Sequence, residues 1–250
     1  IADEPSEYQE VAIAVKKPNK LISSELIFKS ETLDFAFPGK RDVLRSVVET
    51  RDGKTLVFYS CHMKSRSGGR KQTDAQREMA AGLLSAYISG QKDENSIVLG
   101  DMNDSPDDRS LSILESGDVY AKAVNIGNGP ALVNLFEPLY KKDYITFDLH
   151  SLFVGDKIDP IIENSRKENE RTRGIDYRYP QDLEVTQVLF DQILVAPKIA
   201  PGALVGIYAD ADAMRGDVSR TRRNDAGVAT YQYKGSMASD HLPVWAILKI

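Results

Sequence analysis

The stretch Ser96-Ile97-Val98-Leu99-Gly100-Asp101-Met102-Asn103-Asp104 changes abruptly from apolar to polar at its glycine. Its opening residues are typical of a short buried strand, and the polar residues that follow are typical of a loop at the strand's end. Gly100 has no Cβ, so the backbone can pass close to a neighbour there. Asp101 and Asn103 are two residues apart, so in an extended chain their side chains face the same side. The stretch therefore predicts a polar site where a buried strand ends.

The residues before this stretch predict strands, a hairpin and a helix. Two strand-like runs, Leu44–Thr50 and Thr55–Ser60, flank an Asp-Gly pair that favours a tight turn. Val11–Val15 is predicted as an earlier strand. Apolar residues recur at three- and four-residue steps within Thr73–Ser89, which predicts an amphipathic helix.

The residues after Asp104 extend the alternation of strands and helices. A short helix is predicted at Asp107–Glu115, and strands are predicted at Gln187–Val195 and Leu242–Lys249. The segment 119–186 mixes turn signals with a charged run, and we interpret it as a long excursion over the surface. This order predicts one α/β domain over residues 1–250, a four-layer α/β sandwich with two mixed β-sheets flanked by helices, with an insertion at about 119–186.

Composition excludes several classes of protein. Of the 250 residues, 42% are hydrophobic and 28% are charged, which argues against a disordered or fibrous chain. The 32 Lys and Arg against 37 Asp and Glu give a net charge of −5, which disfavours holding nucleic acid by bulk charge alone. The single cysteine, Cys61, excludes an intramolecular disulfide and a Cys-rich zinc site. No apolar run approaches the roughly 18 residues of a membrane helix, and residues 1–20 lack the apolar core of a signal peptide.

Reactive side chains gather at the ends of four predicted strands. They are His62 with Lys64, Asp101 with Asn103, Asp191, and Asp240 with His241. Each alone is a weak signal, because an aspartate commonly closes a turn and a lone histidine is more often structural than catalytic. Their combination and order make a specific pattern.

This pattern resembles the endonuclease/exonuclease/phosphatase superfamily. The residues that carry the resemblance are His62-Met63-Lys64-Ser65, Gly100-Asp101-Met102-Asn103-Asp104, Asp191 and Ser239-Asp240-His241. The resemblance covers about Val11 to Leu248. It is closest over Cys61–Gly69 and Gly100–Pro106, which look like bacterial, often secreted, nuclease-like members, so it favours a secreted or periplasmic protein.

The resemblance implies a role for each site residue in phosphodiester hydrolysis. An anionic phosphate resists attack, so the site must neutralise charge and align a deprotonated water. Asp101 would activate or orient this water, with Asn103 beside it. His62 and His241 would donate to phosphate oxygens, or one of them would act as the acid or base. Asp191 would hold the imidazole of His241 in one tautomer.

The resemblance also implies a divalent ion, Mg²⁺ or else Mn²⁺ or Ca²⁺, contacted by Asp240. Lys64 is either a substrate-binding residue or a solvated loop charge. The superfamily's principal metal-binding glutamate follows strands that find no counterpart at the start of this sequence. Gln9-Glu10-Val11 spells the expected tripeptide in unmatched surroundings, so Glu10 is a weak candidate. We expect a missing N-terminal segment or a partner chain to complete the sheet.

The leading hypothesis is a metal-dependent phosphodiester hydrolase, specifically a nuclease, in which an activated water attacks phosphorus in line. One alternative is a phosphomonoesterase or a phospholipase of the inositol phosphate or sphingomyelin type. The other is a catalytically dead binding protein. The expected partner is nucleic acid or another phosphoester substrate.

Overall fold

The computed structural model describes residues 11–39, 41–66, 69–118, 131–147, 153–154, 157–158, 160–161, 188–210, 220–223, 229–233, 239 and 241–250. Its main elements are β1 (Lys20–Ile27), β2 (Val43–Glu49), β3 (Thr55–His62), α1 (Arg70–Gln91), β4 (Ser96–Asp101), α2 (Arg109–Ser116), β5 (Val133–Asn134), α3 (Glu137–Tyr140), β8 (Asp191–Val195), β9 (Leu204–Ile207) and β12 (Val244–Ile247). Short elements complete it: η1 (Glu31–Leu33), β6 (Phe153–Val154), β7 (Lys157–Ile158), η4 (Pro197–Ile199), β10 (Arg220–Arg223) and β11 (Ala229–Tyr233).

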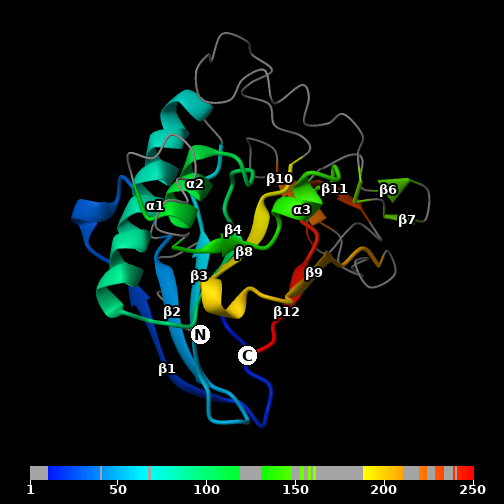
Figure 1. The fold of residues 1–250 in the computed structure, drawn as a ribbon. Coiled ribbons are helices and arrows are strands. Elements are labelled where there is room, and N and C mark those ends of the chain that lie inside the picture. Colours follow the sequence, from blue (N-terminus) through cyan, green and yellow to red (C-terminus); the bar gives the residue numbers. More distant parts are fainter. Residues whose placement is uncertain are drawn as a thin grey trace.

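A six-stranded mixed sheet forms the centre of the described structure (Figure 1). Its strand order is β1-β2-β3-β4-β8-β5, in which β3 and β4 run parallel and the other neighbours run antiparallel. The predicted hairpin is confirmed as β2–β3, and Gly53 adopts a φ of 76° in its turn. Glycine enters this left-handed region without steric cost, which is why Asp-Gly suits the position.

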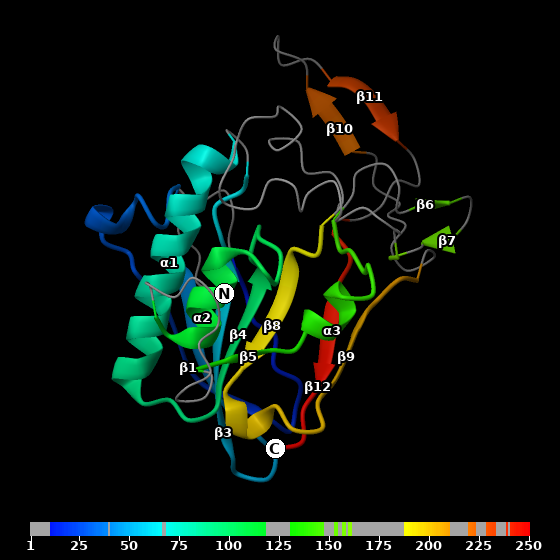
Figure 2. The ribbon, with the colours of Figure 1, turned by 45° about the horizontal axis from the view of Figure 1, so that its top comes forward.

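Side chains of the central strands alternate between two apolar layers, because successive residues of a strand point to opposite faces. Tyr59 and Val98 belong to the layer that contains Leu84 of α1, whereas Ile97 and Val195 belong to the layer that includes β9 and β12. Figure 2 shows α1 and α2 on one side of the sheet and the β9–β12 pair on the other. The predicted α/β sandwich is thereby confirmed, with a large mixed sheet, a second sheet and covering helices.

The structure corrects two local predictions. Residues 11–16 form no strand, so the strand predicted at Val11–Val15 is wrong. The first strand of the sheet is instead the more polar β1, which pairs with β2. Residues 131–147, within the predicted surface excursion, supply Phe136 and Ile145 to the buried interior, and β5 joins the main sheet. Apolar residues scattered among turn signals gave no regular period from which their burial could be inferred. An insertion over 119–186 as a whole stays a prediction.

The predicted helix at Thr73–Ser89 is confirmed and slightly longer, as α1. The helix predicted at Asp107–Glu115 is confirmed as α2, and the strands predicted around β8 and β12 are also present. The described helices include no candidate for a membrane-spanning segment, since each is too short or too polar.

Candidate active site

Three neighbouring strands bring predicted residues to one edge of the main sheet. β3 ends at His62, β4 ends at Asp101 and β8 begins at Asp191. In the register of the sheet, His62 pairs with Asp101, and Asp101 pairs with Asp191. Because β8 runs opposite to β3 and β4, its start meets their ends at the same edge. The strand order therefore assembles groups that are far apart in the sequence.

A turn after β4 fixes the carboxylate of Asp101. The backbone N–H of Asn103 donates to Oδ1 of Asp101 at 2.9 Å, and Nδ2 of Asn103 donates to Oδ2 at 3.0 Å. Asn103 has a φ of 51°, in the left-handed region that residues other than glycine seldom adopt. The two residues lie together as predicted, but through this turn rather than through strand alternation, since β4 ends at Asp101.

Gly100 allows β3 to approach β4 closely behind the site. Its φ is 130°, and a Cβ built on it would lie 2.0 Å from the carbonyl oxygen of Cys61. Position 100 therefore requires a glycine, because the backbone of β3 occupies the space where a Cβ would lie. Cys61 is itself buried, and burial raises the pKa of its thiol to about 12.

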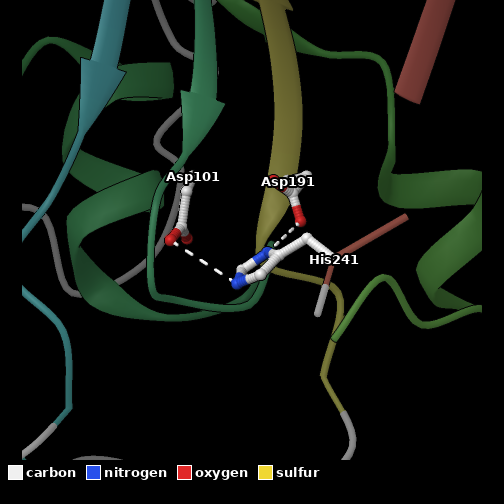
Figure 3. A group of neighbouring side chains, drawn as sticks. All are labelled: Asp101, Asp191 and His241. Atoms are coloured by element: carbon white, nitrogen blue, oxygen red, sulfur yellow. Dashed lines mark hydrogen bonds and ion pairs between the residues drawn. The ribbon is translucent and has the colours of Figure 1, made fainter. Parts of the chain in front are cut away.

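His241, from the last part of the chain, lies against both aspartates (Figure 3). Its Nδ1 is 2.7 Å from Oδ2 of Asp191, and its Nε2 is 3.9 Å from Oδ2 of Asp101. A carboxylate only accepts hydrogen bonds, so Nδ1 carries the hydrogen of the short contact and Nε2 faces Asp101. The predicted hydrogen-bond contact between Asp191 and His241 is confirmed.

Thr146 ties β8 to the segment that carries His241. Its Oγ1 accepts hydrogen bonds from the backbone N–H groups of Phe190 and Asp191 at 3.0 and 3.1 Å. Its carbonyl accepts from the N–H of Leu242 at 2.8 Å. Sequence reasoning missed Thr146, because no motif marks it within the segment 119–186.

Burial and like charge perturb the groups at the centre of the site. The pKa of Asp101 is raised to about 6, mainly because its carboxylate is buried and next because Asp191 repels it. His62 has its Nε2 3.5 Å from Oδ2 of Asp101. Burial, and then the charges of Arg41 and His241, lower the pKa of His62 to about 4. His62 is therefore neutral at pH 7, and its contact with Asp101 is not an ion pair there.

Two cations, Arg41 and Lys64, lie beside these groups. Arg41 donates from a guanidinium nitrogen to the carbonyl of Met63 at 2.6 Å, and Nζ of Lys64 donates to the carbonyl of Ser65 at 3.2 Å. Burial, followed by the charge of Arg41, lowers the pKa of Lys64. Arg41 was not predicted, because no motif marks this residue, which precedes β2.

Asp101, Asp191 and His241 also form a candidate metal-binding group. One ligand atom from each lies within 4.8 Å of the others. A divalent cation suits this arrangement, because it would relieve the repulsion between the two carboxylates that raises the pKa of Asp101. The predicted metal ligands Asp240 and Glu10 fall outside the described residues, so their places in the site stay predictions.

Comparison with protein families matches residues 11–178 to the Endonuclease/Exonuclease/phosphatase family. Among solved structures, humanized D. rerio TDP2 matches with a TM-score of 0.51 and 17% identity, over 93% of this chain and 68% of that one. An endonuclease/exonuclease/phosphatase family protein from Bacteroides thetaiotaomicron has a TM-score of 0.45 and 16% identity, over 81% and 53%. Sphingomyelinase C from Streptomyces griseocarneus has a TM-score of 0.45 and 17% identity, over 83% and 57%.

The chain thus spans little more than half of the last two structures. The comparison with curated proteins yields no match. The predicted partner chain finds no support in these comparisons.

Proposed function

The chain belongs to the endonuclease/exonuclease/phosphatase family, and from this membership we propose that it is a metal-dependent phosphodiester hydrolase, with nuclease action as the leading form. Family membership supports phosphoester hydrolysis in general. The observation that carries the proposal is the position of Asp101 between two imidazoles, with His62 at 3.5 Å and His241 at 3.9 Å. A base beside two imidazoles suits attack of water on an anionic phosphate, because the base can accept the proton of the water while the imidazoles donate to phosphate oxygens.

Asp101 is assigned the task of orienting and deprotonating the attacking water. Both of its carboxylate oxygens accept hydrogen bonds from Asn103, which fixes the plane of the carboxylate. Its side chain keeps 17% exposure, so solvent reaches it. A pKa of about 6 leaves the group ionised at neutral pH and more basic than an ordinary carboxylate.

His62 and His241 are assigned to the phosphate. Asp191 holds the Nδ1 hydrogen of His241, so Nε2 faces the side where Asp101 lies. A proton on Nε2 would be stabilised by the charge of Asp191 when the phosphate gains negative charge. His62, with its low pKa, contributes as a neutral hydrogen-bonding group, and Lys64 is assigned the role of a positively charged substrate contact.

A divalent cation, with Mg²⁺ as the first choice, is assigned to the space beside the carboxylates. Carboxylate oxygens are the ligands that Mg²⁺ prefers. Asp101 and Asp191 are the described carboxylates closest to this space, Asp240 is the further ligand that the resemblance suggests, and Glu10 is a weaker one. A bound ion would neutralise charge on the phosphate oxygens.

A substrate panel tests the proposal. The purified chain is incubated with Mg²⁺ and, separately, with plasmid DNA, bis(p-nitrophenyl) phosphate, p-nitrophenyl phosphate and sphingomyelin. We expect cleavage of DNA and of the diester, loss of both activities on chelation, and a large loss in His241→Ala. Asp34→Asn serves as a control, because Asp34 is exposed after the short helix η1 and should leave the rate unchanged.

Other outcomes would each overturn the proposal. Turnover of the monoester alone would indicate a phosphatase, and turnover of sphingomyelin alone would indicate a phospholipase. Binding of DNA without any turnover, equal in wild type and His241→Ala, would indicate a binding protein.

A further inference from the structure

The left-handed backbone of Asn103 needs support, because the orientation of Asp101 depends on it. Asn103 bonds both carboxylate oxygens of Asp101 and has a φ of 51°. Asparagine enters this region more readily than other residues with a Cβ, and the surrounding contacts fix Asn103 there. Its side chain is held in part by the carbonyl of Met63, which accepts from Nδ2 at 3.0 Å.

Arg66 supplies the matching contact on the backbone of Asn103. Nε of Arg66 donates to the carbonyl of Asn103 at 2.9 Å. The same guanidinium donates to Oδ1 of Asp104 at 3.0 Å and to Oδ2 of Asp108 at 2.5 Å. The side chain of Arg66 is only 6% exposed. Three acceptors on the loop between β4 and α2 thus fix a rigid, planar guanidinium next to the turn that carries Asp101.

Arg66 also contacts the other half of the site. Its Cζ lies 5.1 Å from the centroid of the Phe190 ring, the residue before Asp191. The ring of Phe190 stacks on Phe147 with centroids 5.5 Å apart, and Phe147 packs on the ring of His241 at 4.9 Å. A row of planar groups therefore runs from the guanidinium to His241.

We propose that Arg66 is a positioning residue that fixes the Asp101 turn and the His241 ring relative to each other. Its burial keeps it from the substrate, so it acts only through Asn103 and Phe190. This inference rests on the proposed phosphodiesterase function.

Arg70 offers a matched control from the same buried cluster. One of its guanidinium nitrogens donates to Oδ1 of Asp108 at 2.6 Å and Nε donates to Oδ2 of Asp74 at 3.3 Å, and its side chain is 5% exposed. Within the described residues, no hydrogen bond or ring contact joins Arg70 to Asn103 or Phe190. A lysine at either position keeps the charge but loses the planar fork.

Steady-state kinetics of Arg66→Lys and Arg70→Lys on bis(p-nitrophenyl) phosphate test the proposal. We expect Arg66→Lys to lower kcat about 100-fold with little change in KM, since small misplacements of reacting groups have effects of this size. Arg70→Lys should keep kcat within about threefold of wild type, even if both variants lose similar stability. Equal losses of kcat in the two variants, or a normal kcat in Arg66→Lys, would overturn the proposal.

A second readout separates this proposal from the proposed function. The backbone amide signal of Asn103 in a ¹H–¹⁵N spectrum reports its hydrogen bond to Asp101 whether or not any substrate is turned over. It should shift in Arg66→Lys and stay in place in Arg70→Lys, and the reverse result would refute the positioning role. If Arg66→Lys does not fold, Phe190→Leu replaces it: the ring signals of His241 should then move and kcat should fall, while unchanged signals and kcat would count against the proposal.

Discussion

Replacing Asp101 by asparagine should stabilise the protein while it removes most of the activity. Burial and the neighbouring Asp191 raise the pKa of Asp101 from 3.8 to about 6. Such a rise means that the ionised carboxylate costs the folded state about 3 kcal/mol at neutral pH. Asparagine removes the charge. Its NH₂ group would face the NH₂ group of Asn103, which now donates to Oδ2 of Asp101, and the lost hydrogen bond costs about 1–2 kcal/mol. The expected net gain is about 1–2 kcal/mol in the free energy of unfolding.

The sign of the pH dependence follows from the raised pKa. A carboxyl group whose pKa is higher in the folded state contributes stability that is full below its unfolded value of 3.8 and is lost as the pH rises through about 6. The advantage of Asp101→Asn should therefore be absent near pH 4, where wild type and variant differ only by the lost hydrogen bond, and present near pH 7.5. The phosphodiesterase rate should fall by about 10²–10⁴-fold, the size of a lost general base.

The assay combines urea unfolding at both pH values, in the presence of a chelator, with the rate on a phosphodiester in Mg²⁺. A variant that is less stable than wild type near pH 7.5 and retains its rate would refute the reasoning. Asp101 would then be a turn residue whose carboxylate only accepts hydrogen bonds from Asn103.

Three further substitutions test other parts of the structure. Asp191→Asn should lower kcat by about 10²-fold or more, because an amide cannot balance a charged His241 ring, and the ¹⁵N shifts of that ring measure the change directly. Burial raises the pKa of Glu115 to about 7, so Glu115→Gln should match wild type near pH 4 and gain about 1–2 kcal/mol in the free energy of unfolding near pH 8; equal curves at both pH values would contradict this. Gly100→Ala should lose more than about 3 kcal/mol, because its Cβ would overlap the carbonyl of Cys61, and a denaturant curve close to wild type would show that the strands can separate without cost.

Local patterns were sufficient to predict most of the central sheet. The Asp-Gly turn, the apolar run before Gly100 and the period of α1 each depend on neighbours in the sequence, and each matches the structure. Val11–Val15 failed for a physical reason. Its alternation is that of a strand, but a strand also needs a partner for its backbone hydrogen bonds, and no local pattern shows whether one exists.

The residues of the site also differ in whether a local motif marks them. Asp101, Asp191 and His241 were found because each stands in a recognisable motif at the end of a predicted strand. Arg41 and Thr146 were missed, because neither stands in a motif. Arg41 reaches the carbonyl of Met63 beside the β2–β3 pair, and Thr146 reaches the start of β8, which is distant in the sequence. Contacts of this kind depend on strand order and register, which residue types alone do not determine.

The buried thiol of Cys61 provides a natural probe of local opening in the protein. It is the single cysteine among 250 residues, its Sγ donates to the carbonyl of Tyr59 at 3.6 Å, and burial raises its pKa to about 12. Only an exposed thiolate reacts with an alkylating reagent, so labelling must wait until the apolar layer between the sheet and α1, to which Cys61 belongs, opens. The rate of labelling under native conditions therefore measures how often the layer behind His62 and Asp101 opens, without an introduced probe.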